Sequence, residues 1–278
     1  MSQIEQAVAQ HYTTGALTER VRAALEASGI DPDAATVADL KAGDEFHTGG
    51  VKATDNLFAQ LSPTHATRVL DVGCGIGGTS RYIVDRYDST VTGVDLTPEF
   101  VETAKTLSDL VGHSDKSEFL VGSALDMPVP DAGFDLAVMF HVGMNIEDKA
   151  GLFAEVSRAL ATGGTFALFD VMGGEAAEPL AFPLPWSTVA ETSFVHTPDV
   201  YRDAASAAGL ELVTETDRTE FALAFFEEAF ARMAESGPPA LGIHLMMGET
   251  APEKFQNYVT NLQAGRIRPT EMIFKKTG

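Results

Sequence analysis

The chain has 278 residues, of which 45% are hydrophobic, so it can form one large domain with insertions around a buried core. Its 40 acidic residues outnumber 19 basic ones, and the formal net charge of −21 would repel phosphate backbones and anionic membrane surfaces. We therefore expect neither a nucleic acid nor a membrane as a partner. The first residues lack a basic segment followed by an apolar one, and a single cysteine excludes an internal disulfide, so we expect a cytoplasmic protein.

Residues 1–66 precede the first predicted core strand and have a helical pattern. Leu17, Val21 and Leu25 recur at a spacing of four, and Gly29 is a typical helix end. We predict that this segment is an N-terminal helical cap over the core.

From Arg68 onward, apolar runs alternate with helical patterns, which predicts a parallel sheet with helices on both faces. The predicted strands cover residues 68–72, 90–95, 117–121, 134–140, 164–171, 210–216 and 270–275. The fold class is therefore α/β, with a Rossmann-like, mostly parallel seven-stranded sheet. Its core consists of residues 67–218 and 266–278, and ligands should bind beyond the carboxyl ends of the strands.

Residues 219–265 lie between the last two predicted strands and are far more than a hairpin connection needs. Their phenylalanine and methionine residues have the spacing of packed helices. We predict a helical lid inserted before the last strand, and a possible homodimer contact through it.

The first predicted strand runs into a glycine-rich turn. Gly73, Gly75 and Gly77 let the backbone bend sharply beneath a ligand before a helix begins. The glycines alone also fit the dinucleotide-binding pattern. Asp71 discriminates between the ligands, because a carboxylate there would repel an anionic pyrophosphate and attract a cationic ammonium.

Asp95 ends the next apolar run, where an acidic side chain typically meets the hydroxyls of a ribose. S-adenosylmethionine (SAM) presents both an ammonium and a ribose. With Asp71, the glycines and Asp95 in register, the sequence resembles the class I SAM-dependent methyltransferases. The resemblance implies that SAM is the cofactor, and that the residues around it are Asp71, Gly73, Cys74, Gly75, Gly77, Asp95, Leu96, Ser123, Ala124, Leu125, His141 and Gly49.

Two of these residues follow the third predicted strand, at the family's adenine position. Many relatives carry aspartate where this chain has Ser123, and we expect its hydroxyl to accept a weaker hydrogen bond from the adenine amino group. Leu125 would supply apolar contact with the adenine face.

Within this class, the chain resembles the glycine, sarcosine and dimethylglycine N-methyltransferases. The similarity rests on Tyr12 and on a polar segment that runs from Asp44 to Gly50. It implies that Tyr12, His47 and Gly49 border the substrate and the amino-acid end of SAM. A helix-capping role for His47 remains an equal alternative.

The predicted catalytic residues are His141, His47, Tyr12 and Asp44. His141 ends the fourth predicted strand, beside the expected position of the sulfonium. Either histidine would take the acceptor's proton, a contribution of roughly 10² to 10⁴-fold, with Asp44 or Asp170 orienting a histidine or the amine. The sequence has no metal-ligand spacing, so no metal is expected.

The resemblance favours a small-molecule amine acceptor such as sarcosine or dimethylglycine. No arginine can be assigned to the carboxylate of such a substrate, so a small thiol or a phenolic or hydroxyl metabolite remains the alternative. Two other classes stay open, an NAD-dependent oxidoreductase and a SAM-binding regulatory or scaffold protein without turnover.

Overall fold

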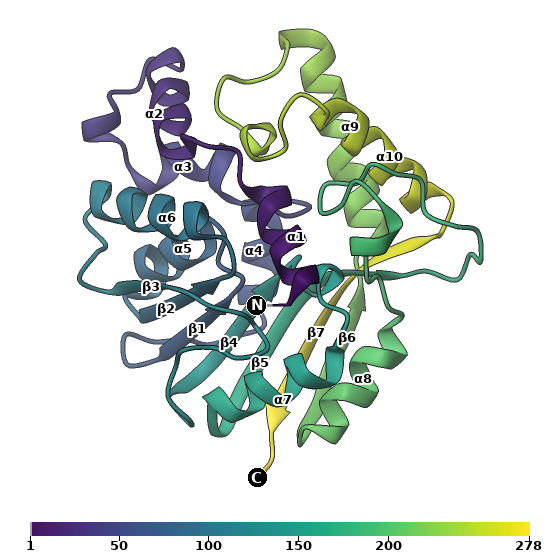
Figure 1. Ribbon diagram of the computed structural model, residues 1–278. Coiled ribbons are helices and arrows are strands. Elements are labelled where there is room, and N and C mark those ends of the chain that lie inside the picture. Colours follow the sequence, from purple (N-terminus) through teal and green to yellow (C-terminus); the bar gives the residue numbers. More distant parts are fainter. Residues whose placement is uncertain (1) are drawn as a thin grey trace.

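The computed structural model describes residues 2–278 and has a single twisted sheet at its centre (Figure 1). The strands are β1 (Arg68–Val72), β2 (Thr90–Asp95), β3 (Ser117–Val121), β4 (Phe134–Phe140), β5 (Leu160–Gly173), β6 (Leu210–Asp217) and β7 (Ile267–Lys276). They lie in the order β3-β2-β1-β4-β5-β7-β6, and β7 runs antiparallel to both of its neighbours. The predicted α/β fold class, with seven mostly parallel strands, is confirmed.

The α-helices are α1 (Gln3–Tyr12), α2 (Leu17–Ala27), α3 (Val37–Asp44), α4 (Val51–Phe58), α5 (Gly78–Tyr87), α6 (Pro98–Leu110), α7 (Lys149–Ala159), α8 (Pro198–Ala207), α9 (Thr219–Ser236) and α10 (Ala251–Gln263). Short 3₁₀ turns are η1 (Pro32–Ala34), η2 (Gly143–Asn145), η3 (Ala190–Thr192) and η4 (Ile243–Met246). Residues 1–66 therefore contain α1 to α4, and residues 219–265 contain α9, η4 and α10. No helix within residues 2–278 is both long and apolar enough to cross a lipid bilayer.

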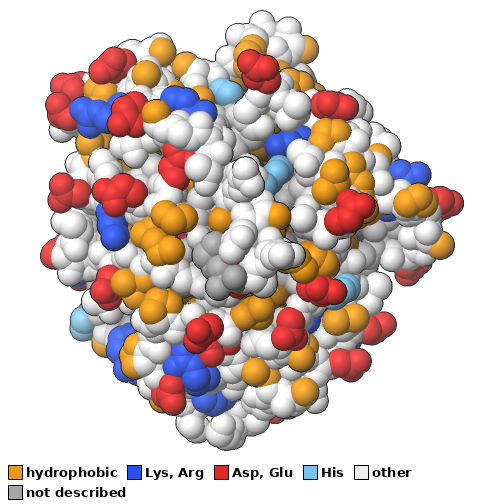
Figure 2. Space-filling view, in the orientation of Figure 1, with side chains coloured by type: hydrophobic (Ala, Val, Ile, Leu, Met, Phe, Trp, Pro, Cys, Tyr) orange, Lys and Arg blue, Asp and Glu red, His pale blue; other side chains and the backbone are white. Residues whose placement is uncertain are grey.

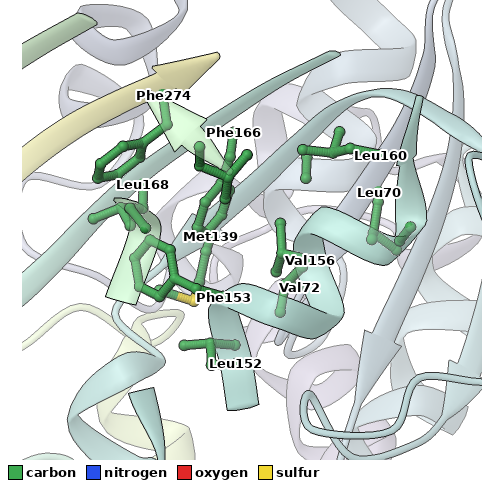
Figure 3. Packing of buried hydrophobic residues seen from close by; sticks show 14 of the residues in the cluster. Leu70, Val72, Met139, Leu152, Phe153, Val156, Leu160, Phe166, Leu168 and Phe274 are labelled. Atoms are coloured by element: carbon green, nitrogen blue, oxygen red, sulfur yellow. The ribbon is translucent and has the colours of Figure 1, made fainter. Parts of the chain in front are cut away.

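Successive residues of a strand point to opposite faces of the sheet, and helices pack against both faces. On one face, α7 and α8 pack over side chains such as Leu70, Met139 and Phe166 (Figure 3). On the other face, α4 and α5 cover Val69 and Val138. These two clusters fix the positions at which the strands end.

The first four strands begin and end at the predicted residues, but β5 and β7 are longer than predicted. Their antiparallel ladder continues to the pair Gly173 and Ile267, beyond the apolar run that marked each strand in the sequence. Backbone pairing extends these strands where side-chain hydrophobicity gives no signal.

The helices outside the sheet gather beyond the carboxyl ends of the central strands. Figure 1 shows α1 lying across this edge, between α2 and α3 on one side and α9 and α10 on the other. Acidic side chains are spread over the face in Figure 2 rather than gathered in one patch. The crowding of helices at one edge of the sheet places the functional site there.

Candidate active site

A cavity of about 330 Å³ lies beyond the carboxyl ends of β1, β2 and β4. Its lining combines the turn after β1, the ends of β2 and β4, the segment after β3 and one side of α1. This is the position at which parallel α/β sheets bind ligands.

Asp71, at the end of β1, is buried and lines this cavity. Its Oδ2 accepts a hydrogen bond of 2.6 Å from the hydroxyl of Ser80 in α5. Burial raises the pKa of Asp71 to about 7. A cationic ligand group beside this carboxyl would therefore stabilise its ionised form.

Asp95, at the end of β2, holds the glycine turn in place. Its Oδ2 accepts the N–H of Gly75 at 2.9 Å, and its Oδ1 accepts the N–H of Thr97 at 2.8 Å. Each carboxylate oxygen keeps a second lone pair for a ligand hydroxyl. The backbone of Gly73 and Gly75 adopts positive φ angles of 71° and 54°, which glycine tolerates best.

The far end of the cavity is closed by α1. The hydroxyl of Ser123 donates a hydrogen bond to the carboxylate of Glu5, and it accepts one from the N–H of Leu125 at 3.1 Å. Ser123 thus lies in the predicted place, but its hydroxyl already donates to a residue 118 positions earlier. Glu5 thus places a carboxylate next to Ser123, the position at which many relatives carry aspartate.

The charges around the cavity have one sign. Six carboxyl side chains line it, those of Glu5, Asp44, Asp71, Asp95, Glu147 and Asp148. Among the described residues of its lining, none is lysine or arginine. Such a cavity repels the pyrophosphate of a dinucleotide and attracts a ligand that carries positive charge.

His47 is held by a buried ionic network. Its Nε2 lies 2.7 Å from Glu45 Oε2, and Lys41 Nζ lies 2.8 Å from the other oxygen of that carboxylate. Thr54 also donates to Glu45 at 2.9 Å. The hydrogen bond to His47 and the charge of Lys41 hold the pKa of Glu45 well below its usual range despite burial.

His141 follows β4 and has a left-handed backbone, with φ of 52°. Its Nδ1 accepts the N–H of Thr48 at 3.4 Å, whereas its buried Nε2 has no partner among the described residues. Burial, reinforced by the nearby His47, lowers the pKa of His141 well below its usual value. The ring is therefore neutral.

Asp44 and Asp170, which were expected to orient a histidine or the amine, form hydrogen bonds with other residues. Asp44 lines the cavity, but it pairs with the fully buried Arg81 at 2.8 Å, and Glu45 is the residue that contacts His47. Asp170 accepts a hydrogen bond from the hydroxyl of Tyr201 and lines neither cavity. Neither carboxylate is hydrogen-bonded to His47 or His141 in the described structure, and a role of Asp44 toward an amine stays a prediction.

A second cavity of about 50 Å³ adjoins the first, and it is strongly aromatic. The two share Tyr12, Phe46, His47 and His141. The rest of the second lining comes from Thr48, Met144, Pro185, Trp186, Phe225, Phe226, Ile243, Phe255 and Tyr258. We call this space the aromatic chamber, and α9 and α10 supply much of its wall.

Most residues predicted from the sequence line the larger cavity. They are Tyr12, Asp44, His47, Asp71, Gly73, Cys74, Gly75, Asp95, Leu96, Ser123, Ala124, Leu125 and His141. Gly49 and Gly77 line neither cavity. A side chain on Gly49 would meet the ring of Phe221 at 2.5 Å, so Gly49 is needed for packing.

Among the lining residues that the sequence did not predict are Glu5, Thr79 and Phe100. Thr79 directly follows the glycine turn, in the first turn of α5, and could have been found there. Glu5 reaches the site only through a contact between distant segments, the hydrogen bond that it accepts from the Ser123 hydroxyl.

Comparisons with known proteins agree with this geometry. Residues 70–168 match the family model described as a methyltransferase domain. Ajmaline N-methyltransferase of Rauvolfia serpentina is 41% identical over 102 residues, which are 37% of this chain and 35% of that protein. A probable chloroplastic tocopherol O-methyltransferase of Oryza sativa subsp. japonica is 42% identical over 95 residues, 34% of this chain and 26% of that protein. The matches thus span about a third or less of these curated relatives.

The fold is similar to that of a solved enzyme over nearly its whole length. Geranyl diphosphate C-methyltransferase from Streptomyces coelicolor A3(2) superimposes with a TM-score of 0.74 at 16% identity, covering 99% of each chain. At this identity the likeness concerns the fold alone. The match to the family model identifies a methyltransferase domain within residues 70–168, and the fold and the acidic cavity at the strand ends are consistent with it.

Proposed function

We propose that the protein transfers a methyl group from SAM, bound in the larger cavity, to a small molecule bound in the aromatic chamber. The observation that carries the proposal is the junction of the two spaces. An acidic cavity at the ends of β1 and β2 adjoins an apolar one, and four residues line both cavities. A methyl donor and its acceptor need this arrangement, because the transfer requires the two reactants to meet in line.

The lining residues match the parts of SAM. Asp71 would hold the ammonium, and Asp95 the ribose hydroxyls. The N–H groups at the start of α5, next to Thr79, suit the carboxylate. Glu5 would accept the adenine amino group, in the place that the sequence assigned to Ser123.

The sulfonium would lie among aromatic rings at the junction. Tyr12 and Phe46 line both cavities, and Phe140 lines the larger one. Ring faces attract a cation through their quadrupole. SAM supplies an electrophilic methyl group, and these side chains would hold it facing the chamber while excluding water.

The chamber is a poor site for an amino-acid acceptor. No lysine or arginine occurs among the described residues that line either space, so the carboxylate of sarcosine or dimethylglycine would have no cationic partner. The six carboxyl groups around the larger cavity would also repel a dinucleotide, which disfavours the NAD-dependent alternative. Sarcosine thus remains a prediction without support from the chamber's lining.

Titration calorimetry tests the cofactor assignment. We expect one binding site for S-adenosylhomocysteine (SAH) and no heat from NADH. Asp95→Asn should weaken SAH binding at least about 10-fold, because hydrogen bonds to an ionised acceptor are the strong ones. Asp109→Asn, an exposed change on α6, should leave the affinity unaltered. Binding of NADH in preference to SAH would overturn the proposal.

A further inference from the structure

The polar side-chain groups of the aromatic chamber nearly all have hydrogen-bond partners within the protein. The hydroxyl of Thr48 donates to that of Tyr258 at 2.8 Å, and the indole N–H of Trp186 donates to Ser193 at 2.9 Å. Tyr12 exchanges hydrogen bonds with Asn145. Among the described residues of this lining, the buried side-chain nitrogen without a partner is Nε2 of His141.

The hydrogen on the His141 ring can be assigned from its contacts. Nδ1 accepts the backbone N–H of Thr48, so it carries no hydrogen. A neutral imidazole has one N–H, which must therefore be on Nε2. His141 presents a hydrogen-bond donor rather than a proton acceptor at this nitrogen.

His47 cannot replace it as a base. Its Nε2 donates to Glu45 at 2.7 Å, and its Nδ1 faces the carbonyl oxygen of Thr48 at 3.4 Å. Both ring nitrogens of His47 thus face groups of the protein. Neither histidine presents a free lone pair to the acceptor.

We propose that the acceptor is an aromatic alcohol of the phenol class, which binds in the aromatic chamber as its oxyanion and receives the hydrogen bond of His141 Nε2. This inference rests on the proposed methyltransferase function and names the substrate class for its site. The aromatic side chains of the chamber would surround the ring of the phenol, and the unpaired N–H of His141 would meet its oxygen.

The number of lone pairs separates the phenolate from an amine. A phenolate oxygen has three lone pairs, so one can attack the methyl carbon while another accepts the hydrogen of His141. A neutral amine nitrogen has one lone pair, which the attack consumes, and its remaining hydrogens would face a donor. The polarity of the chamber therefore favours oxygen over nitrogen.

The reaction balances without a base in the chamber. The phenol releases its proton to solvent before it binds. The oxygen lone pair then forms the O–C bond while the C–S bond breaks, and that electron pair stays on sulfur. An anion and a sulfonium become a neutral ether and a neutral thioether, and the N–H of His141 stabilises the anion until that point.

The test compares acceptors that differ only in the reacting atom. Phenol, thiophenol and aniline, their naphthalene counterparts, and sarcosine are each incubated with the protein and methyl-labelled SAM, and labelled products are measured by mass spectrometry. Binding of each compound to the SAH-saturated protein is measured by calorimetry. We expect labelled aryl methyl ethers in excess of any labelled amine, and binding that selects the phenols.

Two variants of His141 test the donor itself. His141→Leu removes the N–H and should weaken phenol binding to the SAH-saturated protein by about 10-fold or more. His141→Asn keeps a donor and tolerates the left-handed backbone at this position, so it should retain most of the affinity. Equal losses in the two variants would contradict the proposed hydrogen bond.

The outcomes separate this inference from the proposed function. Failure to bind SAH would refute both. SAH binding together with transfer to aniline or sarcosine in preference to phenols would leave the methyltransferase function intact and overturn the phenol assignment. SAH binding with no affinity for any phenol would also overturn it, whatever the variants do.

Discussion

The Ser80 hydroxyl donates a hydrogen bond of 2.6 Å to Asp71 Oδ2 and so ties the first turn of α5 to the end of β1. The bond is direct, yet burial still raises the pKa of Asp71 to about 7. One neutral donor does not compensate for the loss of water around a carboxylate. In the proposed complex, the ammonium of SAM would supply the missing positive charge.

We predict from this that ligand stabilisation depends on pH. The pKa of Asp71 is higher in the folded apoprotein than in the unfolded chain, so its contribution to the free energy of unfolding falls as pH rises from about 4 to about 7. Bound ammonium favours the ionised carboxylate and cancels this loss. The rise in melting temperature caused by SAH should therefore be larger at about pH 7.5 than at about pH 5.5.

Asp71→Asn is the matched variant for this measurement, made by thermal unfolding with and without SAH. It should weaken SAH binding by about 10-fold or more and remove most of the pH dependence of the shift. Burial raises the pKa of Asp170 to about 6, but this residue lines neither cavity. Its effect on the pH dependence of unfolding should therefore be the same with and without SAH. An unchanged pH dependence in Asp71→Asn would contradict the ammonium assignment.

Glu45→Gln should destabilise the protein and impair acceptor binding. The change removes the negative charge that Lys41 and His47 both contact. Breaking a buried ion pair costs on the order of 3 kcal/mol. Urea unfolding measures the loss. Glu26→Gln, on the exposed face of α2, should change stability by less than about 0.5 kcal/mol. A similar stability for both variants would argue against the network.

Helix α1 should act as part of the cofactor site, because Ile4, Glu5 and Val8 line the larger cavity. Val8→Asp puts a further negative charge at a buried position of that wall and should weaken SAH binding about 10-fold. Ala7→Asp changes the exposed neighbour on the same helix and should have little effect. Calorimetry compares the two, and equal affinities would mean that α1 does not contact the cofactor.

The aromatic chamber should affect the acceptor and not the cofactor. Phe225 on α9 lines the chamber but not the larger cavity, so Phe225→Ala should raise KM for the acceptor several-fold and leave SAH affinity unchanged. Phe230, half-buried on the same helix, lines neither space, and Phe230→Ala is the control. Steady-state kinetics with calorimetry gives both constants. A loss of SAH affinity alone would contradict the assignment.

The sequence predicts the cofactor half of the site well, because its signals are local. Asp71, Gly75 and Asp95 end or follow two adjacent parallel strands, so their side chains and backbone meet wherever those strands pair. The same logic places Ser123 after β3, which is the neighbour of β2. Strand order and strand ends suffice for these positions.

The rest of the site, in both the cofactor and the acceptor half, depends on contacts that no local pattern encodes. Glu5 reaches Ser123 across 118 residues, and Thr48 reaches Tyr258 across 210. At the end of α3 the sequence favours Asp44, whereas the carboxylate that contacts His47 is that of Glu45, because Asp44 pairs with the buried Arg81. The predicted homodimer contact through residues 219–265 stays a prediction.

Transfer of a labelled methyl group is the decisive test of the proposed methyltransferase activity. The protein is incubated with methyl-labelled SAM and separate pools of small phenols, thiols and amines, and every product is read by mass spectrometry, with Asp71→Asn in parallel. We expect label in a small molecule and SAH in equal amount, with turnover strongly reduced in the variant. Tight SAM binding with no labelled product from any pool would contradict it and indicate a SAM-binding protein without turnover.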